Sequence, residues 1–166
     1  MMGHENYLPN PSLERRGYYI FLPLPRVRSG GVHLQVKPLR DNDRCYVCGT
    51  QNPEGLGVHF EIEHDARSIS ARFTPRDVHQ GFEGIVHGGI ISALLDEAMA
   101  KLTVALGIPA VTAEMTVKFK APAAPGEELL ITGRLVEEER RLVRAEAAIG
   151  RGPVIVAEAT GKLMRI

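Results

Sequence analysis

The chain contains few of the residues that are typical of secreted, fibrous or membrane proteins. Its 166 residues include two cysteines and no tryptophan. Two cysteines that lie close together are too few for a disulfide framework. No apolar run reaches the roughly 18 residues that a membrane-spanning helix needs, and the N-terminal region has no apolar core followed by a small-residue cleavage site. We therefore expect a cytoplasmic protein that has no membrane as a partner.

The chain also lacks an excess of charge of either sign. It has 20 basic and 20 acidic residues, so its formal net charge is zero. Long-range attraction to nucleic acid or to an anionic membrane needs a strongly basic surface, and we expect neither partner. With 44% hydrophobic and 24% charged residues, the composition is that of a globular chain, and the length is that of about one domain.

Residues 1–42 differ in composition from the rest of the chain. We expect them to form a partly ordered N-terminal extension that packs on its own domain or on a neighbouring subunit, and an arm that docks a partner is the alternative. Residues 43–166 are expected to form the folded domain. Five prolines interrupt any regular element in the extension: Pro9, Pro11, Pro23, Pro25 and Pro38.

Two strands, one long helix and four further strands are expected along residues 43–166. The helix is predicted to begin at about Gly88 and to end near Leu106, because Gly107 and Pro109 follow. Residues 75–86 are expected to form a loop, and short links among the last four strands favour an antiparallel meander. Alternation of apolar and polar residues predicts strands at Leu56–Glu63, Ser68–Thr74, Val111–Ala121, Leu129–Glu137, Leu142–Ile149 and Val154–Arg165.

The predicted helix is apolar on nearly all sides, which is typical of a helix that is buried within a fold. One antiparallel sheet curled around one buried helix accounts for both the strands and the apolar helix. This is an α+β architecture, the hot-dog fold. The apolar helix residues are Ile90, Ile91, Ala93, Leu94, Leu95, Ala98, Met99, Leu102, Ala105 and Leu106.

Asp96 is a carboxylate in the middle of this apolar helix. Glu97 has Lys101 four positions later, and the two residues are expected to form a solvated ion pair, but Asp96 has no cation at that spacing. A carboxylate is costly to bury unless something uses it, so Asp96 is a candidate functional residue. The alternative is that it caps a loop or faces a water-filled interface between subunits.

His87, Gly88 and Gly89 enter the first turn of the helix. The first N–H groups of a helix have no intrahelical partner and carry the positive end of its dipole. Two glycines let a ligand approach these groups closely, which suits a phosphate or the oxyanion that forms on a carbonyl under attack. The alternative is that the glycines permit a tight turn or close packing against the sheet.

Three segments together resemble the hot-dog thioesterase superfamily, and within it the phenylacetate-pathway (PaaI-like) acyl-CoA thioesterases. The resemblance covers about residues 43–166. The spacing of nine residues from the histidine of the His-Gly-Gly motif to the helix aspartate is specific within the superfamily. The segments are Cys45-Tyr-Val-Cys48-Gly49, Asn52-Pro-Glu-Gly55-Leu56, and His79-Gln-Gly-Phe-Glu-Gly-Ile-Val-His87-Gly-Gly, which continues to Asp96 and Met99.

The resemblance implies an acyl-CoA thioesterase that needs neither a metal nor an organic cofactor. The backbone N–H of Gly88 would polarise the thioester carbonyl, and Asp96 would act as general base or as nucleophile. Thr112 lies where relatives carry a hydroxyl that orients the attacking water. In this family the site spans a dimer interface, so that Gly88 and Asp96 come from different subunits, and many relatives pair such dimers into tetramers.

We expect substrate contacts from His87, Gly89, Gln80 and Gly81. Some relatives carry asparagine at the position of Gly81, where it fixes the substrate or a water, and glycine has no side chain for that role. Gln80 or His79 is the candidate to replace it. Packing within the loop is the alternative role for His79 and His87.

Two other patterns are weaker candidates for binding sites. Cys45 and Cys48, followed by His59 and His64, approach a zinc-finger spacing, but ten residues separate Cys48 from His59 where about twelve are usual. The two histidines would also point to opposite faces of a strand. We expect no bound metal, and we expect the cysteines to pack in a turn near the mouth of the site.

Lys118 and Lys120 alternate along the strand that follows the helix and would share one face of it. They are candidates to contact the phosphates of coenzyme A as point charges. The alternative is that they cover a solvated outer face of the strand.

The sequence therefore predicts a thioester hydrolase that acts on acyl-CoA as a homodimer or as a dimer of dimers. Fold alone does not decide function, so two alternatives stay open. One is a non-catalytic protein with the same fold that binds acyl-CoA or lipid, and the other is a hot-dog enoyl-CoA hydratase. No Gly-x-Ser-x-Gly segment is present, so a serine hydrolase mechanism has no support.

Overall fold

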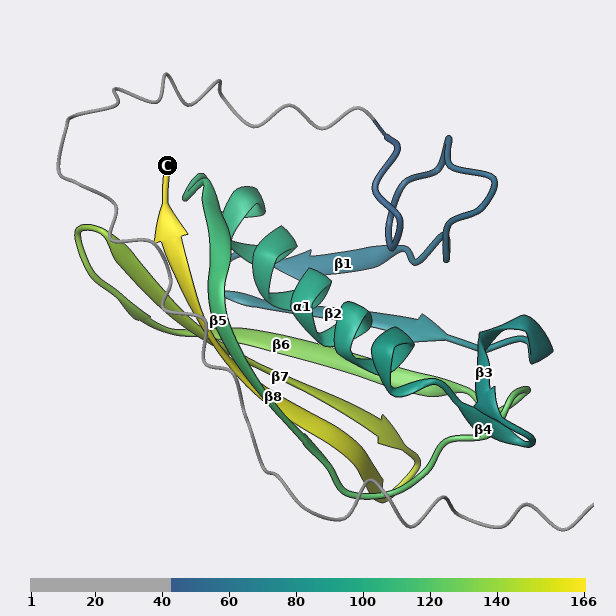
Figure 1. The fold of residues 1–166 in the computed structure, drawn as a ribbon. Coiled ribbons are helices and arrows are strands. Elements are labelled where there is room, and N and C mark those ends of the chain that lie inside the picture. The colour runs from purple at the N-terminus through teal and green to yellow at the C-terminus, as the bar shows by residue number, and fades with distance from the viewer. Residues whose placement is uncertain (1–42) are drawn as a thin grey trace, which may run out of the picture. The chain divides into compact units, whose positions relative to one another are not determined.

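The computed structural model describes residues 43–166 (Figure 1). The extension that we expect over residues 1–42 lies outside the described residues and stays a prediction. In the described part of the chain, no helix combines the length and the apolar character that crossing a bilayer requires.

Six antiparallel strands form one sheet, in which β1 and β5 are the two edges. β7 lies between β6 and β8 and alternates between buried and half-buried residues along most of its length, which is the pattern of a strand with one face against a core. The sheet order is β1-β2-β6-β7-β8-β5. The strands are β1 (Phe60–Glu63), β2 (Ser68–Phe73), β5 (Ala110–Phe119), β6 (Leu129–Glu138), β7 (Leu142–Arg151) and β8 (Val154–Arg165).

Helix α1 (Gly88–Ala105) lies across one face of this sheet (Figure 1). Burial of one large apolar side chain contributes about 1.5–3 kcal/mol, so the helix is a main source of the stability of the fold. The prediction of one long buried helix against an antiparallel sheet is confirmed, and the chain has the hot-dog fold. The helix residues with no exposed surface include Leu94, Leu95, Ala98, Met99 and Leu102.

Gly107 ends the helix as the sequence predicts. It has a φ of +74°, a left-handed conformation that glycine adopts without steric cost. Its N–H donates to the Val104 carbonyl at 3.0 Å, and the Ile108 N–H donates to the Thr103 carbonyl at 2.8 Å. These bonds satisfy carbonyls that the helix end would otherwise leave unpaired.

Two glycines allow α1 to approach the sheet closely. A Cβ atom at Gly133 in β6 would lie 2.9 Å from Ile69 Cγ2 and 3.3 Å from the Ala98 carbonyl oxygen. A Cβ atom at Gly161 in β8 would lie 2.9 Å from the Met99 sulfur. The two distances of 2.9 Å are shorter than real Cβ contacts, so the glycines make room for the helix on the inner face.

The predicted meander of the last four strands is wrong for β5. β6, β7 and β8 pair in chain order, but β5 pairs with β8 at the far edge of the sheet. The link between β5 and β6, residues 120–128, is no tight hairpin turn. It has enough residues to pass β8 and β7, a span of about three strand spacings or ~14 Å.

The structure also shortens the first predicted strand, which begins at Phe60 and not at Leu56. The N–H groups of Leu56 and Val58 donate to the carbonyls of Tyr46 and Val47, at 2.7 and 2.8 Å. Their backbone groups are therefore used to hold the preceding cysteine loop, and they are not free for the sheet ladder.

The expected loop at residues 75–86 contains short regular elements. They are a 3₁₀ turn, η2 (Asp77–His79), and a two-stranded hairpin of β3 (Gln80–Phe82) and β4 (Ile85–Val86). Gly84 supplies the positive φ of +73° in the turn of this hairpin. The hairpin leads directly into α1 and so fixes where the helix begins.

Candidate functional site

The first turn of α1 leaves one backbone donor open. His87 is the N-cap, and its Nδ1 accepts a hydrogen bond from the Gly89 N–H at 2.8 Å. The His87 carbonyl accepts from the N–H groups of Ile90 and Ile91, at 2.9 and 3.3 Å. Among residues 43–166, the N–H of Gly88 has no acceptor. The open donor is the one that the resemblance assigns to carbonyl polarisation.

The two glycines of this turn have different roles. A Cβ atom at Gly89 would lie 2.8 Å from Nδ1 of His87, so a side chain there would displace the cap. A Cβ atom at Gly88 would meet only the Phe119 ring, at 3.4 Å, and Gly88 is exposed. The interpretation as a tight turn therefore applies to Gly89, while Gly88 leaves its N–H open to a ligand.

Two buried oxygen atoms have no hydrogen-bond partner within the described part of the chain: Asp96 Oδ1 and Thr112 Oγ1. Asp96 is half-buried on α1, and Thr112 is half-buried at the start of β5, next to a bulge. An unpaired buried polar group costs ~1–3 kcal/mol, and more if it is charged, so native structures rarely keep one. Both groups are thus placed to bind water, a ligand or a second chain.

Gly88 and Asp96 of the same chain lie too far apart to act on one atom. They are separated by eight positions on one helix, and a rise of 1.5 Å per residue puts them about 12 Å apart along the axis. A reacting carbonyl must lie about 3 Å from an oxyanion donor. The two groups of one chain therefore do not reach the same reacting atom.

The Gln80 amide is occupied within its own loop. Its Nε2 donates to the Asp77 carbonyl at 3.0 Å, and its Oε1 accepts from the Gly84 N–H. A Cβ atom at Gly81 would lie 2.9 Å from His87 Cδ2 and 3.1 Å from His87 Cα, so an asparagine at position 81 would require His87 to move. Their assignment to substrate binding stays a prediction, and these contacts favour a role for Gln80 in shaping the loop.

His79 is a partnered, buried histidine. It is 5% exposed, its ring stacks on Phe73 with centroids 5.5 Å apart, and its Nδ1 accepts from the Arg76 N–H at 3.0 Å. Burial lowers the pKa of His79 below its usual range, and the positive charge of Arg76 lowers it further. Packing in the loop, the alternative interpretation, accounts for this residue.

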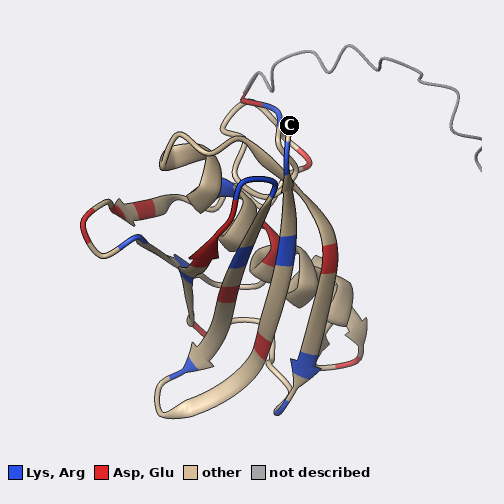
Figure 2. Ribbon diagram, turned by 90° about the vertical axis from the view of Figure 1, so that its left-hand side faces the viewer, with Lys and Arg blue, Asp and Glu red and all other residues tan. Residues whose placement is uncertain are grey.

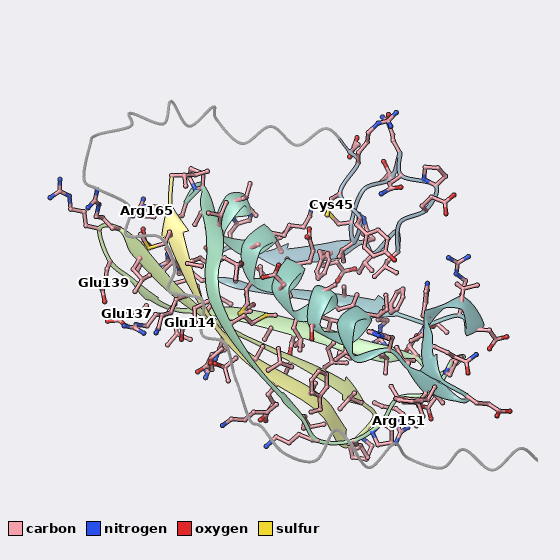
Figure 3. All side chains as sticks on the ribbon, in the orientation of Figure 1. Cys45, Glu114, Glu137, Glu139, Arg151 and Arg165 are labelled. Carbon is pink, nitrogen blue, oxygen red and sulfur yellow. The ribbon has the colours of Figure 1, made fainter. Side chains whose placement is uncertain are left out.

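Sequence reasoning missed a cluster in which the cysteine turn contacts α1 (Figure 3). The Cys45 thiol donates to Glu97 Oε2 at 3.3 Å, and Lys101 Nζ donates to Cys48 Sγ at 3.2 Å. Glu97 and Lys101 are half-buried, and each contacts a cysteine sulfur, so their surroundings are less solvated than their spacing predicts. Burial, with the neighbouring Glu97, raises the pKa of Cys48 to about 12.

No sequence signal joins these groups, because more than fifty residues separate each cysteine from its helix partner. The proposed zinc-finger set is not formed within residues 43–166, since the acidic and sulfur ligands that converge there do not include a histidine. His59 and His64 are exposed on either side of β1.

Lys118, in β5, and Lys120, which follows the strand, lie toward the outer face of the sheet. Lys118 is paired in register with Glu158, and Lys120 Nζ lies 3.4 Å from Glu158 Oε2. Figure 2 shows basic and acidic residues interspersed along these strands. The interpretation as a solvated outer face is therefore favoured over contact with coenzyme A phosphates.

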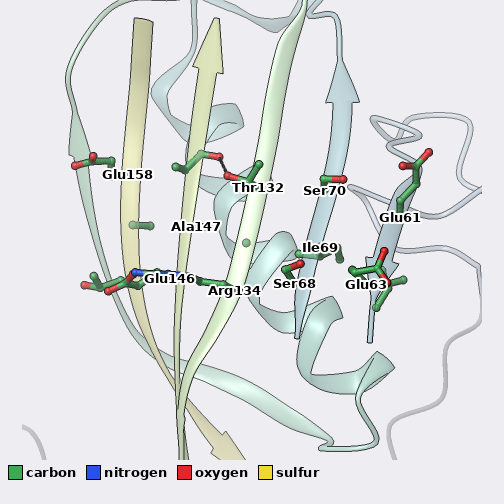
Figure 4. A pocket seen from close by; sticks show the side chains of 15 residues that line it. Glu61, Glu63, Ser68, Ile69, Ser70, Thr132, Arg134, Glu146, Ala147 and Glu158 are labelled. Carbon is green, nitrogen blue, oxygen red and sulfur yellow. Dashed lines mark hydrogen bonds and ion pairs between the residues drawn. The ribbon is translucent and has the colours of Figure 1, made fainter. Parts of the chain in front are cut away.

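A groove of about 690 Å³ lies on this outer face, away from α1 (Figure 4). Its polar lining includes Ser70, Thr132 and Glu158, and Arg134 pairs there with Glu146 at 2.7 Å. Neither the open donor at the helix start nor the two unpaired oxygens line this groove. A hollow on one chain is therefore not where the candidate catalytic groups meet.

Comparison with protein families gives a matching family model. The model described as the thioesterase superfamily matches residues 83–156. This range includes Gly88, Asp96 and Thr112, and it runs from the hairpin before α1 into β8. The cysteine turn lies outside it.

Acyl-coenzyme A thioesterase 13 of Mus musculus is 30% identical to this chain over 88 residues, which are 52% of this chain and 59% of the mouse protein. The chain therefore spans less than two thirds of the length of that relative.

Solved structures share the fold. The PaaI protein from the phenylacetic acid degradation operon of E. coli is 25% identical, with a TM-score of 0.62, over 67% of this chain and 80% of that protein. The smu.793 protein of Streptococcus mutans UA159, in a structure bound to acetyl CoA, is 23% identical, with a TM-score of 0.60, over 65% of this chain and 89% of its own.

Proposed function

We propose that this chain, which is similar to the thioesterase superfamily over residues 83–156, hydrolyses acyl-coenzyme A thioesters to a free acid and coenzyme A. The observation that carries the proposal is the presence of two groups with complementary chemical roles on one helix. An open backbone donor lies at the start of α1, and a half-buried carboxylate, whose Oδ1 is buried and unpaired within residues 43–166, lies about 12 Å further along the same helix.

The N–H of Gly88 is suited to bind the thioester carbonyl oxygen. As water attacks the carbonyl carbon, negative charge develops on that oxygen, and a fixed N–H at the positive end of a helix stabilises it. The donor needs no reorganisation, because His87 and the helix already satisfy the N–H groups that follow it. Loss of one such donor costs about 10²–10³-fold in rate.

Asp96 supplies the base or the nucleophile. As a base, its carboxylate takes a proton from water while the water oxygen attacks the carbonyl carbon, and the coenzyme A thiolate then leaves. As a nucleophile, it would attack the carbonyl carbon and expel the coenzyme A thiolate, which leaves an anhydride that water then hydrolyses. Thr112, whose hydroxyl is also unpaired, would orient the water in either route.

The complete site is proposed to form between two copies of the chain. β5 is an edge strand, with Thr112 near its start and Phe119, which flanks Gly88, at its end. If two copies pair antiparallel along β5, a two-fold axis places the end of one strand beside the start of the other. The Gly88 end of one chain would then face Thr112 and the carboxylate region of its partner.

Exposed apolar side chains support this pairing surface. Phe119 is 57% exposed and Val111 41% exposed on β5. Phe82, in the hairpin that precedes the helix, is 80% exposed. A second copy would cover such side chains and would also exclude water from the reacting groups. The dimer, its pairing into tetramers and the cytoplasmic location stay proposals.

The test is release of free coenzyme A thiol from a panel of short, medium, long and phenylacetyl thioesters. We expect turnover by the native chain and a loss of ~10²–10⁴-fold in Asp96→Asn, the range that general acid–base catalysis contributes. Asp65→Asn is the matched control, because it makes the same chemical change in the exposed turn after β1 and should leave kcat unchanged.

Three results would contradict the proposal. Full turnover by Asp96→Asn would remove the carboxylate from the mechanism. Binding of acyl-CoA without turnover by the native chain would favour a binding protein, and hydration of an enoyl-CoA included in the panel would favour a hydratase.

A further inference from the structure

Three side chains of the types that can ligate a metal ion converge outside the candidate active site. One ligand atom each of Cys45, Cys48 and Glu97 lies within 4.8 Å of the others, and all three residues are half-buried. The cysteines come from the turn at the start of the described chain, and Glu97 comes from the middle of α1. Side chains that come from two elements far apart in sequence and converge in this way form a chelating arrangement.

The cysteine turn is held in shape before any ligand binds. The Gly49 N–H donates to the Cys45 carbonyl at 2.9 Å, and a Cβ atom at Gly49 would lie 2.5 Å from that same oxygen. The Val47 N–H donates to Cys45 Sγ at 3.4 Å. The backbone bonds from Leu56 and Val58 fasten the turn to the segment before β1. Such preorganisation lowers the entropic cost of binding an ion.

The distance between two of the three ligand atoms is close to that in a tetrahedral metal site. With metal–sulfur and metal–oxygen bonds of about 2.3 and 2.0 Å, two ligands at the tetrahedral angle lie about 3.5 Å apart. Cys45 Sγ and Glu97 Oε2 lie 3.3 Å apart. An ion could therefore replace the thiol proton between them with little movement of the side chains.

We propose that Cys45, Cys48 and Glu97 bind a zinc ion. Thiolate ligands select zinc over magnesium or calcium, and three protein ligands leave a fourth tetrahedral position for water or for another ligand. On binding, each thiol releases its proton to solvent and its sulfur forms a bond to the metal. No oxidation state changes in this step.

The charges of the cluster are balanced in the loaded site. Two thiolates and one carboxylate carry three negative charges, and zinc contributes two positive charges. Lys101, whose Nζ lies 3.2 Å from Cys48 Sγ, supplies the remaining positive charge and a hydrogen bond to a ligating sulfur. Hydrogen bonds from outside the ligand set are a regular part of metal sites.

The position of the third ligand also explains why the spacing of cysteines and histidines in the sequence did not predict a metal site. The spacing pairs the cysteines with His59 and His64, which are exposed and lie elsewhere. The third ligand is instead the residue after Asp96. A bound ion would cross-link the turn to α1 at that point and so stabilise the helix segment that carries the candidate catalytic carboxylate.

The first experiment uses the full chain, purified under reducing conditions, stripped with a chelator and titrated with Co²⁺. We expect one Co²⁺ per chain, an intense thiolate-to-cobalt charge-transfer absorption and visible bands of tetrahedral intensity, all lost on addition of Zn²⁺. We also expect zinc in the protein as purified and a lower Tm after chelation. The result that overturns the proposal is a cobalt spectrum without thiolate charge transfer.

Variants assign the ligands. Cys45→Ser and Cys48→Ser should each abolish the charge-transfer absorption or reduce it by half. Glu97→Gln, which keeps both thiols, should weaken zinc binding by at least ~10-fold, the lower end of the cost of losing a supporting contact. Glu61→Gln, at an exposed position on β1, should bind as the native chain does.

Two outcomes decide against zinc even where a cysteine variant fails to fold. Native-like affinity for zinc in Glu97→Gln would show that Glu97 is not the third ligand. Conversion of the reduced native chain to a Cys45–Cys48 disulfide in the presence of excess zinc would assign the turn to redox chemistry. These readouts do not involve thioester hydrolysis, so their failure leaves the proposed function standing.

Discussion

Asp96 and Glu97 are consecutive carboxylates on one helix, but their surroundings differ. Asp96 Oδ1 is buried and has no partner within residues 43–166, whereas Glu97 accepts a hydrogen bond from the Cys45 thiol. Neighbouring residues of a helix point about 100° apart, so the two side chains face different parts of the molecule. The Asp96 side has an oxygen that residues 43–166 leave unpaired, and the Glu97 side is completed by the cysteine turn.

Substitutions on the two sides should therefore fail in different ways. A buried polar group that the chain itself satisfies contributes to stability, and its loss leaves the partner unpaired. A group that the chain leaves unpaired costs stability, so replacing it should affect turnover far more than folding. Each prediction below tests one consequence of this difference.

After the Asp96→Asn loss given above, the next largest effect is expected where the open N–H itself is removed. Gly88→Pro deletes that donor, and proline is tolerated at the first position of a helix. His87 has φ −60° and ψ 131°, the extended backbone that a residue before proline prefers. We expect kcat to fall by ~10²–10³-fold with little change in circular dichroism or Tm.

Gly88→Ala is the matched control for this prediction. It adds a Cβ atom at the same place, 3.4 Å from the Phe119 ring, but it keeps the N–H. Equal losses of activity in the alanine and proline variants would mean that the space at position 88 matters and that the donor does not.

A mixture of two inactive variants tests whether the site is shared between chains. In a heterodimer of Asp96→Asn and Gly88→Pro, one of the two sites receives the intact glycine from one chain and the intact aspartate from the other. Random exchange of subunits should therefore restore about a quarter of native activity, measured after unfolding and refolding the mixture. Activity no higher than that of the separate variants would place each site within one chain.

Thr112→Val should give a smaller kinetic effect, of about 10-fold in kcat, because the hydroxyl orients water and takes no proton. Stability should stay the same or rise by up to ~1 kcal/mol, since the variant removes a buried oxygen that has no partner within residues 43–166. Urea denaturation and thiol release measure the two quantities on the same samples.

Thr103→Val provides the control for the threonine prediction. Thr103 is fully buried on α1, and its hydroxyl donates to the Ala100 carbonyl at 2.8 Å. Its replacement should leave kcat unchanged. If Thr112→Val lowers stability as well as turnover, Thr112 has a structural partner and belongs with the satisfied groups.

The main elements of the fold could be predicted from sequence because its signals are local. The apolar periodicity of α1 and the glycine after it identify the helix, and alternation identifies β6, β7 and β8 to within about two residues. The position of β5 could not be predicted, because the link at residues 120–128 permits both a neighbouring strand and a crossover. Strand order is set by the tertiary packing of α1, which no local pattern encodes.

In the candidate site, too, some residues could be predicted from the sequence and others could not. Asp96 and Gly88 stand out in sequence because each conflicts with a local rule, a charge in an apolar helix and glycines at a helix start. Glu97 stands out as half of an ordinary helix pair, and its contact with Cys45 spans 52 positions. A satisfied long-range contact leaves no conflict in the sequence, so only the structure shows it.

The smallest effect is expected at His79. Its Nδ1 has a hydrogen-bond partner, and the residue lies near the candidate active site. Its carbonyl accepts the His87 N–H at 2.8 Å, so it supports the start of α1. Because burial lowers the pKa of His79 in the folded state, the unfolded chain binds the proton more readily. The stabilising contribution of the neutral ring is therefore complete above the unfolded pKa of about 6.5 and is lost as the pH falls toward the folded value.

His79→Asn tests this, because an asparagine oxygen can keep the hydrogen bond from the Arg76 N–H without titrating. We expect the native free energy of unfolding to decrease between about pH 7 and about pH 5.5, and the variant to show a flatter profile over that range. Carboxylates such as Glu127 and Glu138, whose pKa values hydrogen bonds and arginines hold below their usual range, act only at lower pH. An unchanged profile in the variant would show that His79 does not titrate on unfolding, and the partnered histidine would then belong with the groups whose charge state the fold leaves unaltered.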